Sequence, residues 1–470
     1  MENKLIKIIS KIPKKKIGLL FSGGIDSLTI AYYLKQLNYD FTCYTVGLKG
    51  SSDLKYAKEI AKELDLKLKT KIITQKEIPS YLEKVVPLIG NTSPVQVSIA
   101  TTIFIATELA KKDNVDLIVS GTGADELFGG YARHLKSEDL NKDLKEGLKA
   151  LHNNDVPRER KIMEYFNLES FAPFLRLEKF AMKLPASEKI SEGINKYCIR
   201  KLMLGKVSEE YALRKKTAAQ YGSKLDKAIS KLAGKSKTKY LNQFFKLGVL
   251  FSSGKDSCYA TQLMKEQNYN LSCLITIKSS NKDSYMYHTP NIDLVSLQSE
   301  SMEIPLLTQN TTGLKEDELE DLEKVLIKAK KEYGILGVVT GALFSKYQAS
   351  RIESICDKLN LKCFNPLWHK DQEKYMKEVI SKDFEIIFSS IAADGLSKEW
   401  LGKKITLKDV EKLIKLNSKI GLNVAGEGGE FESLVLNCPL FKKKIKIQES
   451  DIQMENEFTG KFIIKKAKLT

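Results

Sequence analysis

A strand–turn–helix pattern that occurs twice constrains the fold of this chain more than any other feature. Residues 247–257 read Leu-Gly-Val-Leu-Phe-Ser-Ser-Gly-Lys-Asp-Ser, and residues 17–27 read Ile-Gly-Leu-Leu-Phe-Ser-Gly-Gly-Ile-Asp-Ser, at a constant offset of 230 residues. A second match, offset by 220 residues, pairs residues 118–121 with residues 338–341. Two matches in the same order predict a duplicated domain rather than a repeated loop.

Each copy of the pattern joins a buried strand to an anion-binding turn. The apolar run is typical of a buried parallel strand. The turn places backbone N–H groups and hydroxyls at a helix N-terminus, which favours a bound phosphate. Asp26 and Asp256 are acids inside these turns, so we expect a cation beside the phosphates. The turn is not a Walker loop, because Val249 stands where that loop requires its first glycine.

The order of apolar and amphipathic segments predicts an α/β fold in both halves. Helical patterns, such as that of residues 52–64, alternate with short apolar runs. We expect further strands at residues 41–46, 69–73, 115–120, 271–277, 305–308, 337–341, 362–364 and 384–391. Such alternation makes parallel sheets whose ligands bind at the carboxyl ends of the strands.

Composition narrows the class of protein. The 470 residues, 42% hydrophobic and 29% charged, are enough for two to four globular domains. No apolar run reaches bilayer length and the N-terminus lacks a signal-peptide pattern, so we expect a cytoplasmic protein without membrane contact. The seven cysteines are scattered and include no C-x-x-C pair, so we expect neither a disulfide framework nor a zinc site. The net charge of +17 comes from dispersed lysines, which favours a solvated surface over direct nucleic-acid binding.

A glycine-rich loop is the second chemical feature of the first half. Residues 121–131 read Gly-Thr-Gly-Ala-Asp-Glu-Leu-Phe-Gly-Gly-Tyr and follow a predicted strand. Asp125 and Glu126 stand where a metal contact opposite Asp26 would be needed. In isolation, a glycine-rich turn with an acid at a helix N-cap would be the favoured interpretation. Its pairing with residues 22–27 favours a ligand site.

The first half resembles the synthetase domain of asparagine synthetases and β-lactam synthetases. The resemblance covers about residues 14–232 and rests on residues 22–27, 121–131, 168–175, 180–185 and 214–222. It implies an ATP site formed by Ser22, Gly23, Gly24, Asp26, Ser27, Asp125 and the phosphate contact Lys216. Within that site, it implies that Asp26 and Asp125 are ligands of Mg²⁺.

Two departures from this family matter. The family's Glu in the G-E-G segment is Thr122 here, so the acid associated with the amide-forming step is missing. There is also no glutaminase domain and no Cys at position 2, so this half is not expected to draw ammonia from glutamine. The resemblance therefore implies ATP binding and leaves amide synthesis by the first half open.

Three acids crowd a glycine loop near the end of the second half. Glu427, Glu430 and Glu432 lie in and beside the segment Gly-Glu-Gly-Gly-Glu, just before an apolar strand. Like charges packed together are unfavourable unless a cation binds among them. A solvated acidic turn is the alternative. The glycines and the adjoining strand favour a ligand loop.

The second half resembles the diphthine–ammonia ligases over about residues 246–445. The matching segments are residues 252–257, 285–291, 337–341, 365–369 and 426–432. Ser253 replaces the first glycine of the family's turn, and Asn437 replaces an aspartate. The RNase-like carboxy-terminal modules of eukaryotic relatives are absent, as in archaeal forms.

The resemblance implies an ATP-dependent ligase that converts diphthine on elongation factor 2 into diphthamide. The substrate carboxylate attacks the α-phosphorus of ATP to give an acyl-adenylate and pyrophosphate, and ammonia then displaces AMP. It implies catalytic roles for Asp256, Lys255 and Glu430. The implied ATP site comprises Ser252, Ser253, Gly254, Lys255, Asp256, Ser257 and Gly341, with Asp256 on Mg²⁺. A trimethylammonium group favours acids and aromatic faces, so the expected substrate residues are Tyr287, His288, Trp368, His369, Glu427, Gly428, Gly429 and Glu432.

Together these resemblances imply two tandem adenine-nucleotide-alpha-hydrolase-like (PP-loop, Rossmann-like) domains and a small α+β substrate subdomain. We expect the boundaries at residues 1–235, 246–380 and 381–470, with a polar linker at residues 233–245. Three alternatives stay open: a tRNA-modifying PP-loop ATPase, an asparagine-synthetase-like amidotransferase with a catalytic first half, and a first half that is only a nucleotide-binding scaffold. A homodimer is also left open.

Overall fold

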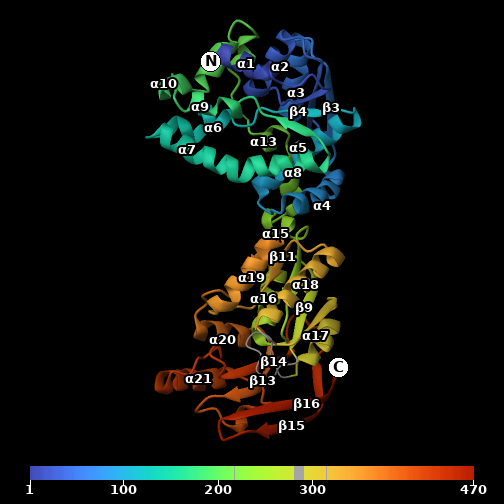
Figure 1. The fold of residues 1–470 in the computed structure, drawn as a ribbon, viewed down its shortest axis with the longest axis vertical. Helices are drawn as coiled ribbons and strands as arrows, with labels where there is room; N and C mark the ends of the chain where they lie inside the picture. Colours follow the sequence, from blue (N-terminus) through green and yellow to red (C-terminus); the bar gives the residue numbers. More distant parts are fainter. Residues whose placement is uncertain (216, 280–290, 314) are drawn as a thin grey trace. The chain divides into compact units, whose positions relative to one another are not determined.

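The computed structural model describes residues 1–470 except residues 216, 280–290 and 314, and it leaves out the side chains of residues 315 and 316. The described residues form two compact units, Met1–Leu241 (unit 1) and Asn242–Thr470 (unit 2) (Figure 1). Each unit has its own buried apolar core.

A five-stranded parallel sheet forms the centre of unit 1. Its order is β3-β2-β1-β4-β5. The strands are β1 (Ile17–Leu20), β2 (Phe41–Leu48), β3 (Leu68–Ile73), β4 (Leu117–Val119) and β5 (Glu169–Phe171). The central strands β1 and β4 are almost wholly buried, because helices cover both faces of such a sheet.

Helices of unit 1 precede, connect and follow these strands. The longer ones are α1 (Glu2–Ile9), α2 (Ile25–Gln36), α3 (Ser52–Glu63), α4 (Ile78–Ile89), α5 (Pro94–Lys112), α7 (Leu140–Ala150), α8 (Val156–Tyr165) and α14 (Leu225–Ala233). The shorter ones are α6 (Ala124–Phe128), α9 (Glu178–Ala181), α10 (Ala186–Lys189), α11 (Tyr197–Met203), α12 (Glu209–Ala212) and α13 (Ala219–Gly222). A π-helical turn, Leu151–Asp155, joins α7 to α8, so that the three run end to end (Figure 1). The sequence patterns did not predict α4, α7 or α8.

Unit 2 repeats the same parallel sheet. Its order is β10-β9-β8-β11-β12, which matches the order in unit 1 strand by strand. The strands are β8 (Lys246–Leu250), β9 (Asn270–Ser279), β10 (Leu306–Thr311), β11 (Gly337–Val339) and β12 (Lys362–Phe364). The helices are α16 (Lys255–Glu266), α17 (Val295–Met302), α18 (Lys315–Tyr333), α19 (Lys346–Lys358) and α20 (Gln372–Ser381). The prediction of a duplicated α/β fold with parallel sheets is confirmed.

An antiparallel sheet completes unit 2. Its order is β14-β13-β16-β15, and its strands are β13 (Glu385–Ala392), β14 (Phe431–Asn437), β15 (Ile445–Met454) and β16 (Thr459–Leu469). Helix α21 (Leu407–Ile420) connects β13 to β14 and begins with a capping box in which Asp409 bonds to Thr406. The prediction of an α+β segment at the carboxyl end is confirmed; its binding role stays a prediction.

The predicted linker at residues 233–245 is more ordered than its composition indicates. Part of it forms a short helix, α15 (Lys237–Asn242). The apolar side chain of Leu241 and the amide of Asn242 are both buried, which stabilises a segment that is otherwise rich in lysine. The predicted polar linker thus contains a short helix, and its role as a domain boundary stays a prediction.

No single described helix is both long enough and apolar enough to cross a membrane. One pair of helical segments, Gln75–Ile89 and Pro94–Lys112, passes the test of length and apolarity only when taken together, and the two are bent by 108° at the break.

Candidate functional site

The two predicted anion-binding turns share one backbone conformation. In unit 1, φ is +67° at Gly23 and −76° at Gly24, the N-cap of α2. In unit 2, φ is +69° at Ser253 and −78° at Gly254, the N-cap of α16. Each turn brings the first N–H groups of a helix to the carboxyl end of the central strand, where phosphate is bound favourably. Ser253 adopts the left-handed conformation despite its side chain.

The serines close each turn in the same way. The hydroxyl of Ser27 donates to Gly24 O at 3.1 Å, and that of Ser257 donates to Gly254 O at 3.2 Å. Gly24 N donates to Ser22 Oγ at 3.2 Å, whereas in unit 2 the N–H of Ser252 donates to Ser257 Oγ at 3.2 Å. The hydroxyls therefore shape both turns as well as lying beside the expected phosphates.

A glycine at the end of a neighbouring strand packs directly on each turn. A methyl group on Gly341 would lie 2.9 Å from the carbonyl carbon of Asp256 and from Ser257 N. A methyl group on Gly121 would lie 2.9 Å from Asp26 Cβ. Glycine is thus needed at both positions because the strand end approaches the helix so closely.

The acid of the unit 2 turn is held by a lysine and a tyrosine. Lys255 Nζ lies 3.0 Å from Asp256 Oδ1 and 2.9 Å from Oδ2, and Lys255 is 3% exposed. The hydroxyl of Tyr375, from α20, donates to Asp256 Oδ1 at 2.5 Å. Burial, and then the charge of Asp256, raise the pKa of Tyr375 well above its usual value. Tyr375 therefore stays a neutral donor that orients this carboxylate.

The antiparallel sheet is attached to the same turn. Lys255 N donates to Ser433 Oγ of β14 at 3.1 Å, and Val435 N donates to Ser253 O at 3.2 Å. The side-chain amide of Gln298 donates to Ser253 O at 3.1 Å and to Val435 O at 2.8 Å. These bonds fix β14, and the acidic loop that precedes it, beside the turn.

Glu427 is a loop acid whose pKa responds to the charges of the turn. Burial raises its pKa to about 7, with the charge of Asp256 adding to the shift. Lys255 and the backbone N–H of Phe344, which bonds to the carboxylate, act in the opposite direction. A carboxyl group with a pKa near neutrality can exchange a proton at the pH of a cell.

The other acids of this loop have different surroundings. Glu430 accepts bonds from Asn423 N at 3.1 Å and from Gly428 N at 2.8 Å, so its carboxylate braces the loop from within. Gly428 and Gly429 are exposed, and Gly429 has a φ of +86°. Glu432 is exposed although it follows buried Phe431. Surrounding protein raises the pKa of Glu432 to about 7 as well, with Lys255 opposing the shift and Asp256 adding to it, although part of its side chain stays in solvent.

Phe344, His369 and Trp368 form an aromatic cluster that contacts Glu427 through the Phe344 backbone. Phe344, whose N–H bonds to Glu427, packs edge-on against His369 with ring centroids 5.6 Å apart. Trp368 is half-buried and packs on His369 at 4.9 Å. The predicted substrate residues Tyr287 and His288 lie outside the described residues.

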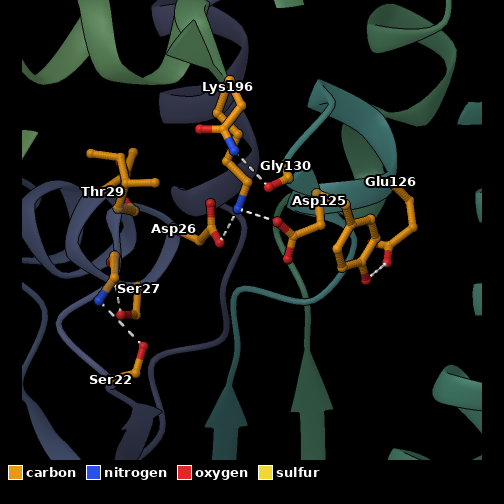
Figure 2. Close-up of polar contacts among 12 residues, drawn as sticks. Ser22, Asp26, Ser27, Thr29, Asp125, Glu126, Gly130 and Lys196 are labelled. Carbon is orange, nitrogen blue, oxygen red and sulfur yellow. Dashed lines mark hydrogen bonds and ion pairs between the residues drawn. The ribbon is translucent and has the colours of Figure 1, made fainter. Parts of the chain in front are cut away.

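In unit 1, a buried lysine joins the two predicted metal ligands. Lys196 Nζ lies 2.5 Å from Asp26 Oδ2 and 2.6 Å from Asp125 Oδ1, and its side chain is 1% exposed (Figure 2). The charges of both acids raise the pKa of Lys196 against the opposing effect of burial, which is the largest single influence. Glu126 accepts a bond from Tyr131 on the same loop. Lys216, the predicted phosphate contact, lies outside the described residues.

Comparison with known proteins relates each unit to a different family. Family models of the diphthamide synthase N-terminal and C-terminal domains match residues 245–363 and 371–470, and the asparagine synthase model matches residues 13–145 and 136–240. Diphthine–ammonia ligase of Rattus norvegicus is 36% identical over 226 residues, which cover 44% of this chain and 84% of the relative. The chain belongs to the diphthine–ammonia ligase family.

Two further relatives show the same division. Diphthine–ammonia ligase of Homo sapiens is 35% identical over 227 residues, which cover 44% of this chain and 84% of that protein. A putative glutamine-hydrolysing asparagine synthetase of Methanocaldococcus jannaschii is 33% identical over 286 residues, which cover 52% of each chain. This member of the diphthine–ammonia ligase family therefore carries an additional asparagine-synthase-type unit.

The two units of this diphthine–ammonia ligase family member differ in how well they fit the expected magnesium ion. In unit 2, burial and the charge of Asp256 raise the pKa of Glu427, and a bound cation would relieve this repulsion. In unit 1, Lys196 already bonds to both Asp26 and Asp125, so it would have to leave one of them before a metal could bind. No group of three or more metal-binding side chains occurs among the described residues. Mg²⁺ commonly needs only one or two carboxylates beside substrate phosphates.

Sequence reasoning missed two residues of these sites in this diphthine–ammonia ligase family member. Lys196 lies 170 residues from Asp26 along the chain, and Tyr375 lies 119 residues from Asp256. Lys196 and Tyr375 both stand in segments outside the family motifs, and the residue type alone is the signal that could have found them. That signal is weak, because this chain has many lysines.

Proposed function

We propose that the chain is an ATP-dependent ligase that forms the amide of diphthamide on diphthine-bearing elongation factor 2, with ammonia as the nitrogen source. The observation that carries this proposal is the anion-binding turn of unit 2 with Asp256, set beside Glu427 and an aromatic group of residues. The membership of this chain in the diphthine–ammonia ligase family supports the same reaction. A C–N bond forms and ATP is cleaved to AMP and pyrophosphate.

The activation step uses the turn. A carboxylate is a poor electrophile, so its oxygen attacks the α-phosphorus of ATP and pyrophosphate leaves, giving an acyl-adenylate. The N–H groups of Ser253 and Gly254, together with the hydroxyls of Ser252 and Ser257, bind the departing pyrophosphate. The positive charge of Lys255 also stabilises the pyrophosphate. Gly341 allows the chain at the end of its strand to lie close to the turn. Asp256 would hold Mg²⁺, which when bound supplies charge neutralisation at the phosphates.

The substrate side is formed by the acidic loop and its aromatic neighbours. Diphthine carries a trimethylammonium group next to its carboxylate, and such a cation is stabilised by acids and ring faces. Trp368 packs on His369, and His369 packs on Phe344, whose N–H bonds to Glu427. The predicted roles of Tyr287, His288, Gly428, Gly429 and Glu432 in binding stay predictions.

The second step needs a proton acceptor. Ammonia attacks the acyl carbon, AMP leaves with the bonding electron pair, and nitrogen releases a proton. The pKa values of Glu427 and Glu432 are both raised to about 7, which suits the task. We assign proton acceptance to Glu427, because it is the less exposed of the two and Asp256 is the largest charge acting on it. The catalytic role of Glu430 stays a prediction; its carboxylate accepts bonds from the backbone of the loop that carries Glu427.

The test is amidation followed by mass spectrometry of the modified histidine. The full chain is incubated with ATP, Mg²⁺, ammonium and diphthine-bearing elongation factor 2, and Asp256→Ala is compared with Asp26→Ala. We expect the amide with the wild-type chain and with Asp26→Ala, and none with Asp256→Ala. No mass change with the wild-type chain, or loss of product only in Asp26→Ala, contradicts the proposal.

Three wider assignments follow from this reaction. We place the protein in the cytoplasm, where elongation factor 2 works. We assign residues 1–235 to an ATP-binding domain, residues 246–380 to the catalytic PP-loop domain and residues 381–470 to the substrate subdomain. A tRNA-modifying ATPase is the competing assignment; ATP cleavage stimulated by tRNA and not by the factor would favour it.

A further inference from the structure

A lysine-lined groove in unit 2 takes no part in the proposed reaction, which uses the acidic loop at residues 426–430. Its volume is about 340 Å³. Four lysines and one glutamate provide its charged lining, namely Lys403, Lys412, Lys415, Lys419 and Glu399. Trp400 and Leu416 add apolar surface to this lysine groove. An excess of positive charge beside apolar groups favours an anionic ligand that also has an apolar part.

Helix α21, which packs on α20 (Figure 1), concentrates lysines on one face. Lys408, Lys412, Lys415 and Lys419 follow one another at spacings of four, three and four residues, and all are exposed. Like charges at such spacings destabilise a helix. Cations are also unfavourable at a helix N-terminus, where Lys408 lies. The stability of the helix therefore does not explain this lysine face, whereas a bound anion would.

Two lysines of the groove have no ion-pair partner among the described residues. Lys403 Nζ and Lys412 Nζ lie 2.6 Å and 3.6 Å from Asp409 Oδ1, so this buried acid balances part of their charge. Lys415 and Lys419 form no ion pair with any residue that the structure describes. Their ammonium groups are therefore available to acids of a partner.

The lysine groove begins close to the acidic loop. The N–H of Ala392, at the end of β13, donates to Glu430 O at 2.8 Å. Gly395 lines the groove three residues later and packs on α21, since a methyl group there would lie 2.8 Å from Leu416 Cδ2. Beyond the other end of α21, Asn423 N donates to Glu430 Oε1 at 3.1 Å. Because three residues span at most about 11 Å, one bound segment can contact both the loop and the groove.

The apolar groups of the groove favour a protein segment over RNA. Trp400 stacks on Phe388 with ring centroids 5.8 Å apart, and Lys403 Nζ lies over the same ring at 5.6 Å. Single-stranded RNA sites offer free aromatic faces on which bases stack, and these contacts already occupy Trp400. Ile420 Cδ1 would lie 3.4 Å from a methyl group at Gly395, and Ile420 is 54% exposed. It therefore offers aliphatic surface to an apolar side chain.

We propose that the lysine groove binds an acidic segment of the protein substrate, next to the side chain that the acidic loop holds. Acids of that segment pair with Lys415 and Lys419, and an apolar side chain packs on Leu416 and Ile420. This rests on the proposed function, because the acidic loop defines where the modified side chain lies. The cation of the substrate then meets acids while its neighbouring acids meet lysines, so that opposite charges fix its orientation.

The test compares Lys415→Gln/Lys419→Gln with the wild-type full chain. Amidation of diphthine-bearing elongation factor 2 is measured over a range of factor concentrations, and binding of fluorescently labelled factor without ATP is measured by anisotropy. Both are repeated at low and at high salt. We expect KM and Kd to rise about fivefold at low salt while kcat stays within about twofold. The Kd of the wild-type chain should rise with salt more steeply than that of the variant.

A matched control removes two lysines from another helix of unit 2. Lys328 and Lys331 are exposed residues of α18, so Lys328→Gln/Lys331→Gln changes the net charge equally. This variant should leave KM, Kd and their salt dependence unchanged. Ile420→Ala should raise Kd about threefold without altering its salt dependence, because only apolar surface is removed.

Three results would overturn the proposal. One is an unchanged Kd and salt dependence in Lys415→Gln/Lys419→Gln. Another is an equal effect of Lys328→Gln/Lys331→Gln, which would mean that only net charge matters. The third is a single-stranded RNA oligonucleotide that displaces the factor and needs the same two lysines, which would assign the groove to RNA. The binding measurement does not depend on catalysis: lysine-dependent binding without any amide would contradict the proposed function and leave the docking surface in place.

Discussion

Lys196 Nζ lies 2.5 Å from Asp26 Oδ2, so a buried ammonium pairs with the acid of the unit 1 turn. The same nitrogen reaches Asp125, which places one positive charge between two carboxylates. In unit 2 the corresponding acid, Asp256, pairs instead with its neighbour Lys255. The duplicated turns therefore use lysines from different places to balance the same aspartate.

Lys196→Met should destabilise unit 1 strongly. Removing the ammonium leaves two mostly buried carboxylates side by side, and breaking a buried ion pair in this way costs about 3–5 kcal/mol of unfolding free energy. Mg²⁺ should recover part of this loss, because it can take the vacated position between Asp26 and Asp125. Urea unfolding of the full chain with and without Mg²⁺ measures both effects.

The control for this prediction is Lys201→Met, an exposed lysine on α11. It should change the unfolding free energy by less than about 0.5 kcal/mol. If Lys196→Met behaved like Lys201→Met, the ion triad would contribute nothing to stability.

Ser253→Gly should stabilise unit 2. Ser253 has a φ of +69°, which costs a residue with a side chain roughly 1 kcal/mol relative to glycine. Its buried hydroxyl also has no hydrogen-bond partner among the described residues. We expect a gain of about 1 kcal/mol, measured by urea unfolding. Gly23→Ser is the mirror change and should destabilise, because its new Cβ would lie 3.1 Å from Ala57 N.

The fold could be predicted because its signals are local. Apolar runs that end in residues 22–27 and 252–257 predict a strand, a turn and a helix within a few positions. The repeat gives the same prediction twice. The continuous helical run from α7 to α8 could not be predicted, because Asn153 and Asn154 at its centre favour turns over helices. Packing of Leu144, Leu148 and Leu151 against the core overrides that preference.

The site was predictable only where its residues are contiguous. The turns and the acidic loop each lie in one short segment. Lys196 and Tyr375 come to their partners from 170 and 119 residues away. Such contacts depend on how helices pack on the sheet, and no short-range pattern reports them. Glu430 was identified from the sequence, but the spacing of the acids does not show that its carboxylate bonds to its own loop.

Gly341→Ala should disrupt the unit 2 reaction. Its new methyl group would lie 2.9 Å from backbone atoms of Asp256 and Ser257, so the start of α16 must shift. A displacement of about 1 Å in a positioned group can lower a rate about 100-fold. We expect a loss of this size in amidation of diphthine-bearing elongation factor 2, followed by mass spectrometry.

Gly121→Ala is the matched change in unit 1, where the methyl group would meet Asp26. It should leave amidation of the factor within about twofold. An equal loss of amidation in both variants would mean that the reaction depends on both turns.

The raised pKa of Glu427 predicts how stability changes with pH. The folded pKa is about 7 and the ordinary value is 4.5. Between these values the folded state keeps the proton and the unfolded state loses it, so unfolding free energy falls as pH rises from about 4.5 to 7. Glu427→Gln removes this term. The variant should therefore gain on the order of 2 kcal/mol relative to the wild-type chain between pH 5 and pH 8, as measured by urea unfolding.

Glu411→Gln, an exposed residue of α21, is the control and should follow the wild-type pH profile. Parallel profiles for Glu427→Gln and the wild-type chain would mean that Glu427 titrates like a surface acid. Its assignment as the proton acceptor would then lose its electrostatic basis, because a carboxylate with an ordinary pKa holds a proton only weakly at neutral pH.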